Sequence, residues 1–195
     1  MPPFNVRTQF ERFAREDSHV ALDELVTLDA TQKAGGKLKF VKAVVDRYDL
    51  TAKDLERERH HFELAFLYRT AAGTFYEAAG YPNDAAYTFD HAARLAHGFF
   101  MRSGAQPEER EQWLFRRLVL RSKAAELFEG IGDYVNAGHS CLYVAEVALT
   151  LKDIPLAEFY ARKGTTFFLQ ERTSPKNHPL REIFSRMVVY RRLGA

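Results

Sequence analysis

The sequence has very little cysteine and no long apolar run. Its 195 residues include a single cysteine, Cys141, so no internal disulfide can form. A domain of this length can bury enough apolar surface to fold without disulfides. No segment approaches the roughly 18 uncharged apolar residues of a membrane-spanning helix, and residues 1–7 lack the apolar core of a signal peptide. We therefore expect a cytoplasmic protein.

The sequence also lacks the common catalytic motifs. It contains no Gly-rich phosphate loop, no serine-centred nucleophile elbow and no CxxC pair. His139 lies two residues before Cys141, but side chains two positions apart on a helix point to different faces, so a Cys–His nucleophile is not predicted. We predict that the protein is not an enzyme, with no catalytic residue and no cofactor.

A strong charge of one sign is missing as well. The net charge is +2 and the isoelectric point is 8.6, below the range of dedicated nucleic-acid-binding domains. Apolar residues make up 46% of the chain and charged residues 28%, which is typical of a folded globular protein and excludes global disorder.

Helical periodicity runs through the whole chain. Apolar residues recur at intervals of three and four, and no segment alternates as a half-buried strand would. Short breaks rich in glycine, proline or aspartate divide the chain into about seven or eight helices. The breaks fall at residues 35–36, 49–51, 80–82, 103–107, 132–133, 152–153 and 173–175. We predict an all-α fold and one domain spanning residues 1–195.

Part of the sequence repeats. Residues 75–85 align with residues 127–137 when the chain is shifted by 52 positions, and residues 152–157 repeat the turn more weakly. Such repetition indicates an array of helical units, in which small residues admit a neighbouring helix, aromatic residues fill the groove and glycine closes the turn. The residues in these roles are Gly73, Tyr76, Gly80, Ala85, Phe89 and Ala92, then Ala125, Phe128, Gly132, Tyr134 and Ala137, and finally Ala157.

This pattern resembles the tetratricopeptide repeat, whose motif has small and aromatic residues at the same spacings. The second unit departs from it, with Cys141 and Val144 where the family favours an aromatic residue and alanine. The 52-residue offset also exceeds the family period of about 34, so longer helices are expected, as in the branch of the soluble NSF attachment proteins.

The resemblance implies a right-handed array of stacked antiparallel helical hairpins over residues 60–170, preceded by N-terminal helices in residues 1–59. It further implies a non-enzymatic adaptor that binds a protein or peptide segment, and it leaves self-association open.

Four basic side chains fall in one short stretch: Arg116, Arg117, Arg121 and Lys123. They are our candidate partner-binding residues, because arginine pairs with a carboxylate through two parallel hydrogen bonds. The alternative, which we favour from the sequence, is a solvated face on which they alternate with Glu126 and Glu129.

A metal site is a second alternative. Glu16 with His19, and Glu58 with His61, form two Glu-x-x-His motifs, a spacing found in di-metal carboxylate bundles. Seven histidines and many glutamates make such matches expected by chance, so surface polar residues are the favoured interpretation and no metal is predicted.

The tail is basic and amphipathic. Residues 172–195 carry six lysines or arginines against one acidic residue, Glu182. An apolar stripe runs through Leu180, Ile183, Phe184 and Met187. We predict that residues 176–195 form a helix that caps the array. Contact with nucleic acid or an acidic membrane is the less favoured alternative.

Overall fold

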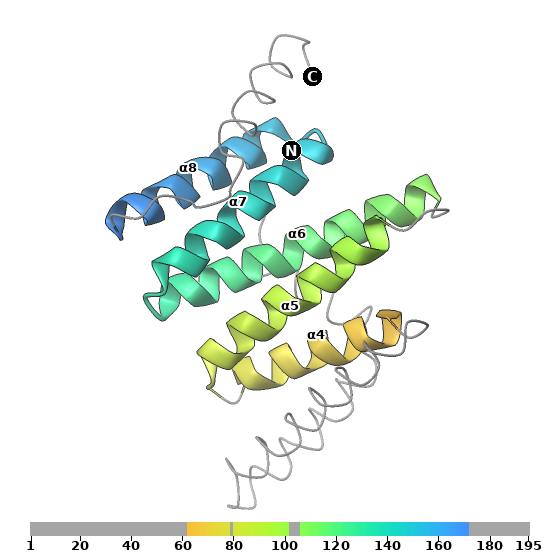
Figure 1. Cartoon of the computed structure of the whole chain (residues 1–195), viewed down its shortest axis with the longest axis horizontal. Helices are drawn as coiled ribbons and strands as arrows, with labels where there is room; N and C mark the ends of the chain where they lie inside the picture. Colours follow the sequence, from red (N-terminus) through yellow and green to blue (C-terminus); the bar gives the residue numbers. More distant parts are fainter. Residues whose placement is uncertain (1–61, 79, 102–105, 172–195) are drawn as a thin grey trace, which may run out of the picture.

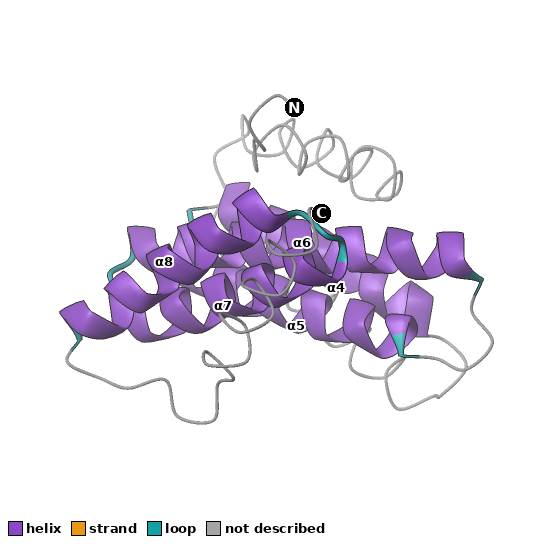
Figure 2. Ribbon diagram, turned by 90° about the horizontal axis from the view of Figure 1, so that it is seen from above, coloured by secondary structure: helices purple, strands orange, loops and turns teal. Residues whose placement is uncertain are grey.

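The computed structural model describes residues 62–78, 80–101 and 106–171. These residues contain five α-helices and no strand (Figures 1 and 2). The helices are α4 (Phe62–Ala78), α5 (Pro82–Phe100), α6 (Pro107–Gly130), α7 (Tyr134–Thr150) and α8 (Ile154–Gln170). The all-α prediction is confirmed for this part of the chain.

Each described helix packs against the next helix in the sequence. Helix α5 contacts α4 and α6, and α7 contacts α6 and α8. Figure 1 shows the helices side by side in chain order, from α4 at one end to α8 at the other. A continuous apolar core therefore runs through the described helices, and α5, α6 and α7 each bury surface against two neighbours.

Three of the turns between helices share one backbone geometry. Gly80 and Gly132 have φ angles of 80° and 79°, and Lys152 takes the same left-handed conformation with φ 61°. After each of these residues, the next amide donates to a carbonyl five residues earlier, as Tyr81 N does to Tyr76 O at 2.8 Å. This is the hydrogen-bond pattern of a Schellman helix end. The three turns occur where the sequence repeat aligns them.

Aspartates begin the helices that follow two of these turns. Asp133 Oδ1 accepts a hydrogen bond from Asn136 N, and Asp153 Oδ1 accepts one from Leu156 N, both at 3.1 Å. Such caps satisfy backbone amides that the first turn of a helix leaves without partners. Pro107, the first residue of α6, needs no partner for its nitrogen. Local chemistry thus fixes where α6, α7 and α8 begin.

Most of the small and aromatic positions of the repeat lie in the core, and Tyr134 is half-buried against it. Ala85, Phe89, Ala92, Ala125, Phe128, Ala137 and Ala157 are all fully buried, and Tyr76 nearly so. A Cβ atom added to Gly73 of α4 would lie 2.6 Å from Cε1 of Phe89 on α5. Gly138 of α7 meets the ring of Phe168 on α8 in the same way, at 2.9 Å. The missing side chains let these helix pairs approach closely.

The predicted terminal segments, residues 1–59 and 176–195, lie outside the described residues. Among the helices that are described, none is both long and apolar enough to cross a membrane.

Replacing Gly73 with alanine should destabilise the protein by ~1–3 kcal/mol, because the new methyl group would overlap the buried ring of Phe89. Gly98 of α5 is the matched control, since a Cβ there meets nothing within 4 Å. Gly98→Ala should instead stabilise the helix by about 0.5–1 kcal/mol. Denaturant unfolding measures both changes.

A double variant separates overlap from a general loss of helix quality. In a Phe89→Leu background, Gly73→Ala should cost measurably less than it does alone, because the smaller side chain leaves room for the methyl group. An unchanged cost in that background would show that the Gly73–Phe89 contact does not limit the helix spacing.

Candidate functional site

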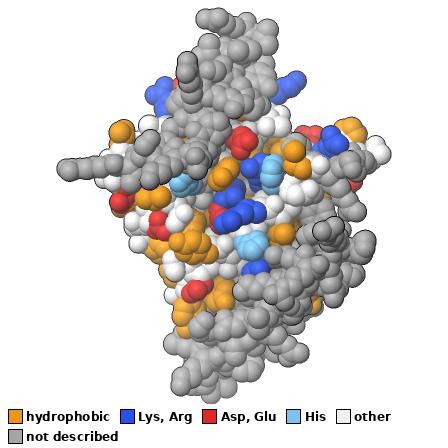
Figure 3. Space-filling model, in the orientation of Figure 1, with side chains coloured by type: hydrophobic (Ala, Val, Ile, Leu, Met, Phe, Trp, Pro, Cys, Tyr) orange, Lys and Arg blue, Asp and Glu red, His pale blue; other side chains and the backbone are white. Residues whose placement is uncertain are grey.

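An open pocket of about 640 Å³ lies between α5, α6 and α7, and we call it the arginine pocket. Each helix contributes one face. The lining residues are Asp90, Arg94 and His97 from α5, Arg117 and Arg121 from α6, and Asn136, His139, Ser140, Tyr143 and Glu146 from α7. Figure 3 shows basic and histidine side chains gathered near the middle of this side of the molecule.

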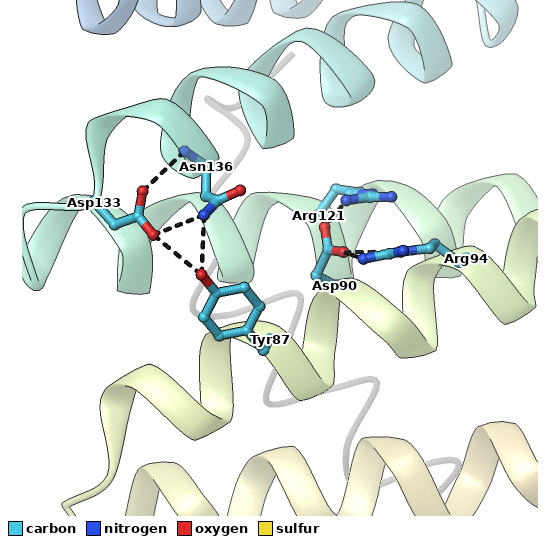
Figure 4. Close-up of polar contacts among 6 residues, drawn as sticks. All are labelled: Tyr87, Asp90, Arg94, Arg121, Asp133 and Asn136. Atoms are coloured by element: carbon cyan, nitrogen blue, oxygen red, sulfur yellow. Dashed lines mark hydrogen bonds and ion pairs between the residues drawn. The ribbon is translucent and has the colours of Figure 1, made fainter. Parts of the chain in front are cut away.

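Arg121 is held by an ion pair with the neighbouring helix. It is only 5% exposed, and its Nη1 atom pairs with Oδ1 of Asp90. Asp90 also accepts two hydrogen bonds at Oδ2 from Arg94, which lies one turn further along α5, at 3.0 Å from Nε and 2.5 Å from Nη2. Figure 4 shows the two arginines converging on one carboxylate. This group of three residues retains one positive charge.

Arg117, on the same face of α6, is held by a residue of α7. It is 6% exposed, and its Nη2 atom lies 3.4 Å from Oε2 of Glu146 on α7. The ring of Tyr143 lies beside both guanidinium groups, with its centroid 4.3 Å from Cζ of Arg121 and 5.7 Å from Cζ of Arg117. The electron-rich face of the ring stabilises the two positive charges.

The two buried arginines do not use all of their hydrogen-bond donors. The Nε atoms of Arg117 and Arg121 are buried and have no acceptor in the structure. Burial lowers the pKa of both side chains, to about 10 for Arg121, although Glu146 and Tyr143 oppose the change. Both groups therefore remain protonated at neutral pH. The pocket holds buried positive charge with N–H donors available to donate to a further anionic partner.

Two histidines line the pocket from opposite helices. Burial lowers the pKa of His97 on α5, and the nearby charge of Arg117 lowers it further, while Glu146 partly opposes both effects. Burial also lowers the pKa of His139 on α7, with a further contribution from Arg121. Both imidazoles are therefore neutral at pH 7, since an ordinary histidine already titrates at about 6.5.

A polar network fixes the first turn of α7 beside the pocket. The hydroxyl of Tyr87 on α5 donates to Asp133 Oδ2 at 3.4 Å and accepts from Asn136 Nδ2 at 3.1 Å. Asn136 also donates to Asp133 Oδ2 at 2.7 Å (Figure 4). These bonds join α5 to the start of α7, so they hold Asn136 in place at the pocket lining.

The structure brings together two of the four basic residues that the sequence suggested. Arg117 and Arg121 lie in the pocket, one turn apart on the same face of α6. The favoured interpretation of the sequence, a solvated face, is wrong for these two residues because both are buried.

The other two basic residues lie elsewhere. The guanidinium of Arg116 lies over the ring of Trp113, 4.3 Å from its centroid. Lys123 forms an ion pair with Glu77 on α4 at 2.6 Å. Neither contributes to the pocket lining.

Sequence reasoning missed the pocket residues of α5 and α7. A signal was present in α5, where Asp90, Arg94 and His97 recur at helical spacing along a segment whose other face is rich in alanine. Polar residues that line one face of a helix, when its other face is alanine-rich and buried, indicate that the polar face also contacts a neighbouring polar surface.

Cys141 has no activated thiol. It is fully buried on α7, and burial raises the pKa of its thiol to about 12. The thiol therefore stays protonated, as expected for a structural cysteine. In the described part of the chain, no three histidine, cysteine, aspartate or glutamate residues are grouped to hold a metal ion. The candidate ligands Glu16, His19, Glu58 and His61 lie outside it.

No protein-family model matches this chain, and neither a curated protein nor a solved structure matches it. Its function therefore has to be inferred from its own residues.

The two pocket histidines should make the fold less stable in mild acid. Their pKa values are lowered in the folded state, so the unfolded chain takes up protons first as the pH falls. Their contribution to stability is complete above about pH 6.5, the ordinary histidine pKa, and is lost as the pH falls toward the lowered folded-state values. Thermal melting between pH 7.5 and 5.5 measures this loss.

The control is the double variant His97→Gln/His139→Gln, which cannot be protonated at either position. Its melting temperature should fall less over the same pH range than that of the wild type. Equal losses in the two proteins would place the acid sensitivity in other residues.

Proposed function

We propose that this chain is a non-enzymatic, tetratricopeptide-like module that binds a protein segment bearing acidic groups in the arginine pocket. The single observation that carries the proposal is the burial of Arg117 and Arg121 beside an open pocket. Carboxylates of the neighbouring helices α5 and α7 hold these two side chains in place. A guanidinium fixed in this way is suited to recognise a carboxylate.

The array architecture of the proposal is supported by the repeated turns and contacts. Gly80, Gly132 and Lys152 end their helices with the same left-handed geometry. Gly73 with Phe89, and Gly138 with Phe168, repeat the same close helix approach. We propose that these units are stacked antiparallel hairpins in a right-handed array, which would present an extended surface to a partner.

The chemistry of the lining favours binding over catalysis. Arginine stays protonated and acts through hydrogen bonds and charge rather than through proton transfer. The carboxylates of Asp90 and Glu146 already pair with arginines. The side chain of Arg94 is 66% exposed, so part of the positive charge is accessible from solvent. These features suit an adaptor, and its single buried cysteine is in keeping with the proposed cytoplasmic location.

Selection of displayed random peptides on the full chain tests this function. We expect the selected peptides to be rich in aspartate and glutamate. Their affinity should fall about 10–100-fold in Arg117→Gln, because a hydrogen bond to a charged group contributes about 1.5–3 kcal/mol. Circular dichroism should show that the variant remains helical.

Arg162→Gln is the matched control, because Arg162 is an exposed arginine of α8 paired with Glu158 one turn away. It should bind the selected peptides as the wild type does. The proposal is wrong if no peptide is selected, or if the selected peptides bind Arg117→Gln and the wild type equally well.

A further inference from the structure

The charges in the arginine pocket do not balance. Three arginines, Arg94, Arg117 and Arg121, face two carboxylates, Asp90 and Glu146. With both histidines neutral, one positive charge remains unmatched. Because the two arginines of α6 are removed from water, this charge is weakly screened and attracts an anion more strongly than a charge on an exposed surface would.

The two carboxylates differ in how firmly they are held. Asp90 is buried and bonds both Arg121 and Arg94, so it is fixed within the fold. The Glu146 side chain is 35% exposed, and its bond to Arg117 is 3.4 Å long, beyond the usual range for an N–H···O bond. Arg117 is therefore the less firmly paired of the two buried arginines and the better able to receive a further anionic group.

We infer that the arginine pocket binds a single carboxylate group of a partner protein at Arg117, and that this binding takes up protons at His97 and His139. The inference rests on the proposed function and specifies the chemistry of its site. A carboxylate carries one negative charge, which matches the one unmatched positive charge. A doubly charged phosphate would leave a negative charge unmatched while the histidines are neutral.

The coupling to protons follows from the groups that face the histidines. His97 of α5, Arg117 of α6 and Glu146 of α7 line the same pocket and interact electrostatically, as do His139 of α7 and Arg121 of α6. Arg94, Asp90 and Tyr143 complete the titratable lining. A bound carboxylate offsets the arginine charges that disfavour imidazolium, so it raises the pKa of both histidines.

Affinity should rise as the pH falls through the bound-state pKa values, and should level off below the free-state values, where the empty pocket is already protonated. If a bound carboxylate raises each histidine pKa by about half a unit, the two together make binding up to about tenfold tighter. The carboxylate itself stays ionised over this range.

Three matched pentapeptides with capped ends test the inference on the full chain. Each has glycine at four positions and either glutamate, glutamine or phosphoserine at the centre. The Nε–Hε NMR resonances of the arginines and the histidine ring resonances are followed during titration at pH 8 and pH 6, at constant ionic strength. The glutamate peptide should shift the Arg117 resonance to saturation, with binding about 2–6-fold tighter at pH 6, where only part of the limiting gain is reached. The glutamine peptide should give no saturable shift.

Two sets of variants locate the effect. Arg94→Gln lowers the net charge of the pocket by one through an exposed side chain and should weaken binding of the glutamate peptide about tenfold, whereas Arg162→Gln, which also replaces an exposed arginine with an ion pair one turn away, should not. In His97→Gln/His139→Gln the ratio of the affinities at pH 6 and pH 8 should fall to about one, whatever the affinity of the variant at pH 8.

The outcomes separate this inference from the proposed function. Equal binding of the glutamate and glutamine peptides, or tighter binding of the phosphoserine peptide at pH 8, would overturn the carboxylate site. Binding of the glutamate peptide at Arg117 without pH dependence would overturn the proton coupling. In each of these cases the proposed protein-binding function would still hold if the acidic peptides selected by display require Arg117 for binding.

Discussion

The burial of Arg117 and Arg121 where α5, α6 and α7 meet constrains the surrounding structure. Removing a guanidinium from water is costly unless carboxylates and hydrogen bonds compensate. The two compensating carboxylates come from different neighbours, Asp90 on α5 and Glu146 on α7. Sliding either helix by one turn along α6 would separate the charges by about 5 Å, so the ion pairs fix the register of all three helices. The apolar contacts of α5 alone, whose buried side chains are mostly alanine, would define its register less sharply.

Close packing elsewhere leaves room for this polar centre. Gly73 accepts the ring of Phe89 between α4 and α5, and Gly138 accepts Phe168 between α7 and α8, so the outer pairs of described helices approach closely. Helices α5 and α7 both pack on α6. Among the described helices, these two do not pack extensively on each other. The arginine pocket occupies the region where these two helices flank α6. Small residues and long charged ones thus have complementary roles in the same array.

The sequence predicted those features that depend on local chemistry. Glycine in a left-handed conformation and aspartate at a helix start act within a few residues, so the turns at Gly80, Gly132 and Asp153 lie where they were expected. The pocket depends on contacts distant in sequence, since Asp90 and Glu146 are far from the basic stretch of α6. Helical spacing nevertheless assigns these basic residues to different faces of α6. Arg117 and Arg121 are four residues apart and share a face, whereas Arg116 is rotated by about 100° from Arg117 and lies over Trp113. The burial of the first two could not be read from their charge.

The neutral histidines reconcile the stability of the empty pocket with its proposed use. A fourth or fifth positive charge beside the three arginines of the pocket would add repulsion among partly desolvated groups. Imidazole avoids this at neutral pH, because burial and the adjacent arginines keep His97 and His139 uncharged. The same side chains can take up charge when an anion enters, which a lysine or arginine in their place could not do. In the empty pocket the charges of Arg117 and Arg121 lower the pKa values of the two histidines. An anion that neutralises either arginine removes part of this effect, so the pKa of the neighbouring histidine rises and the histidine takes up a proton more readily.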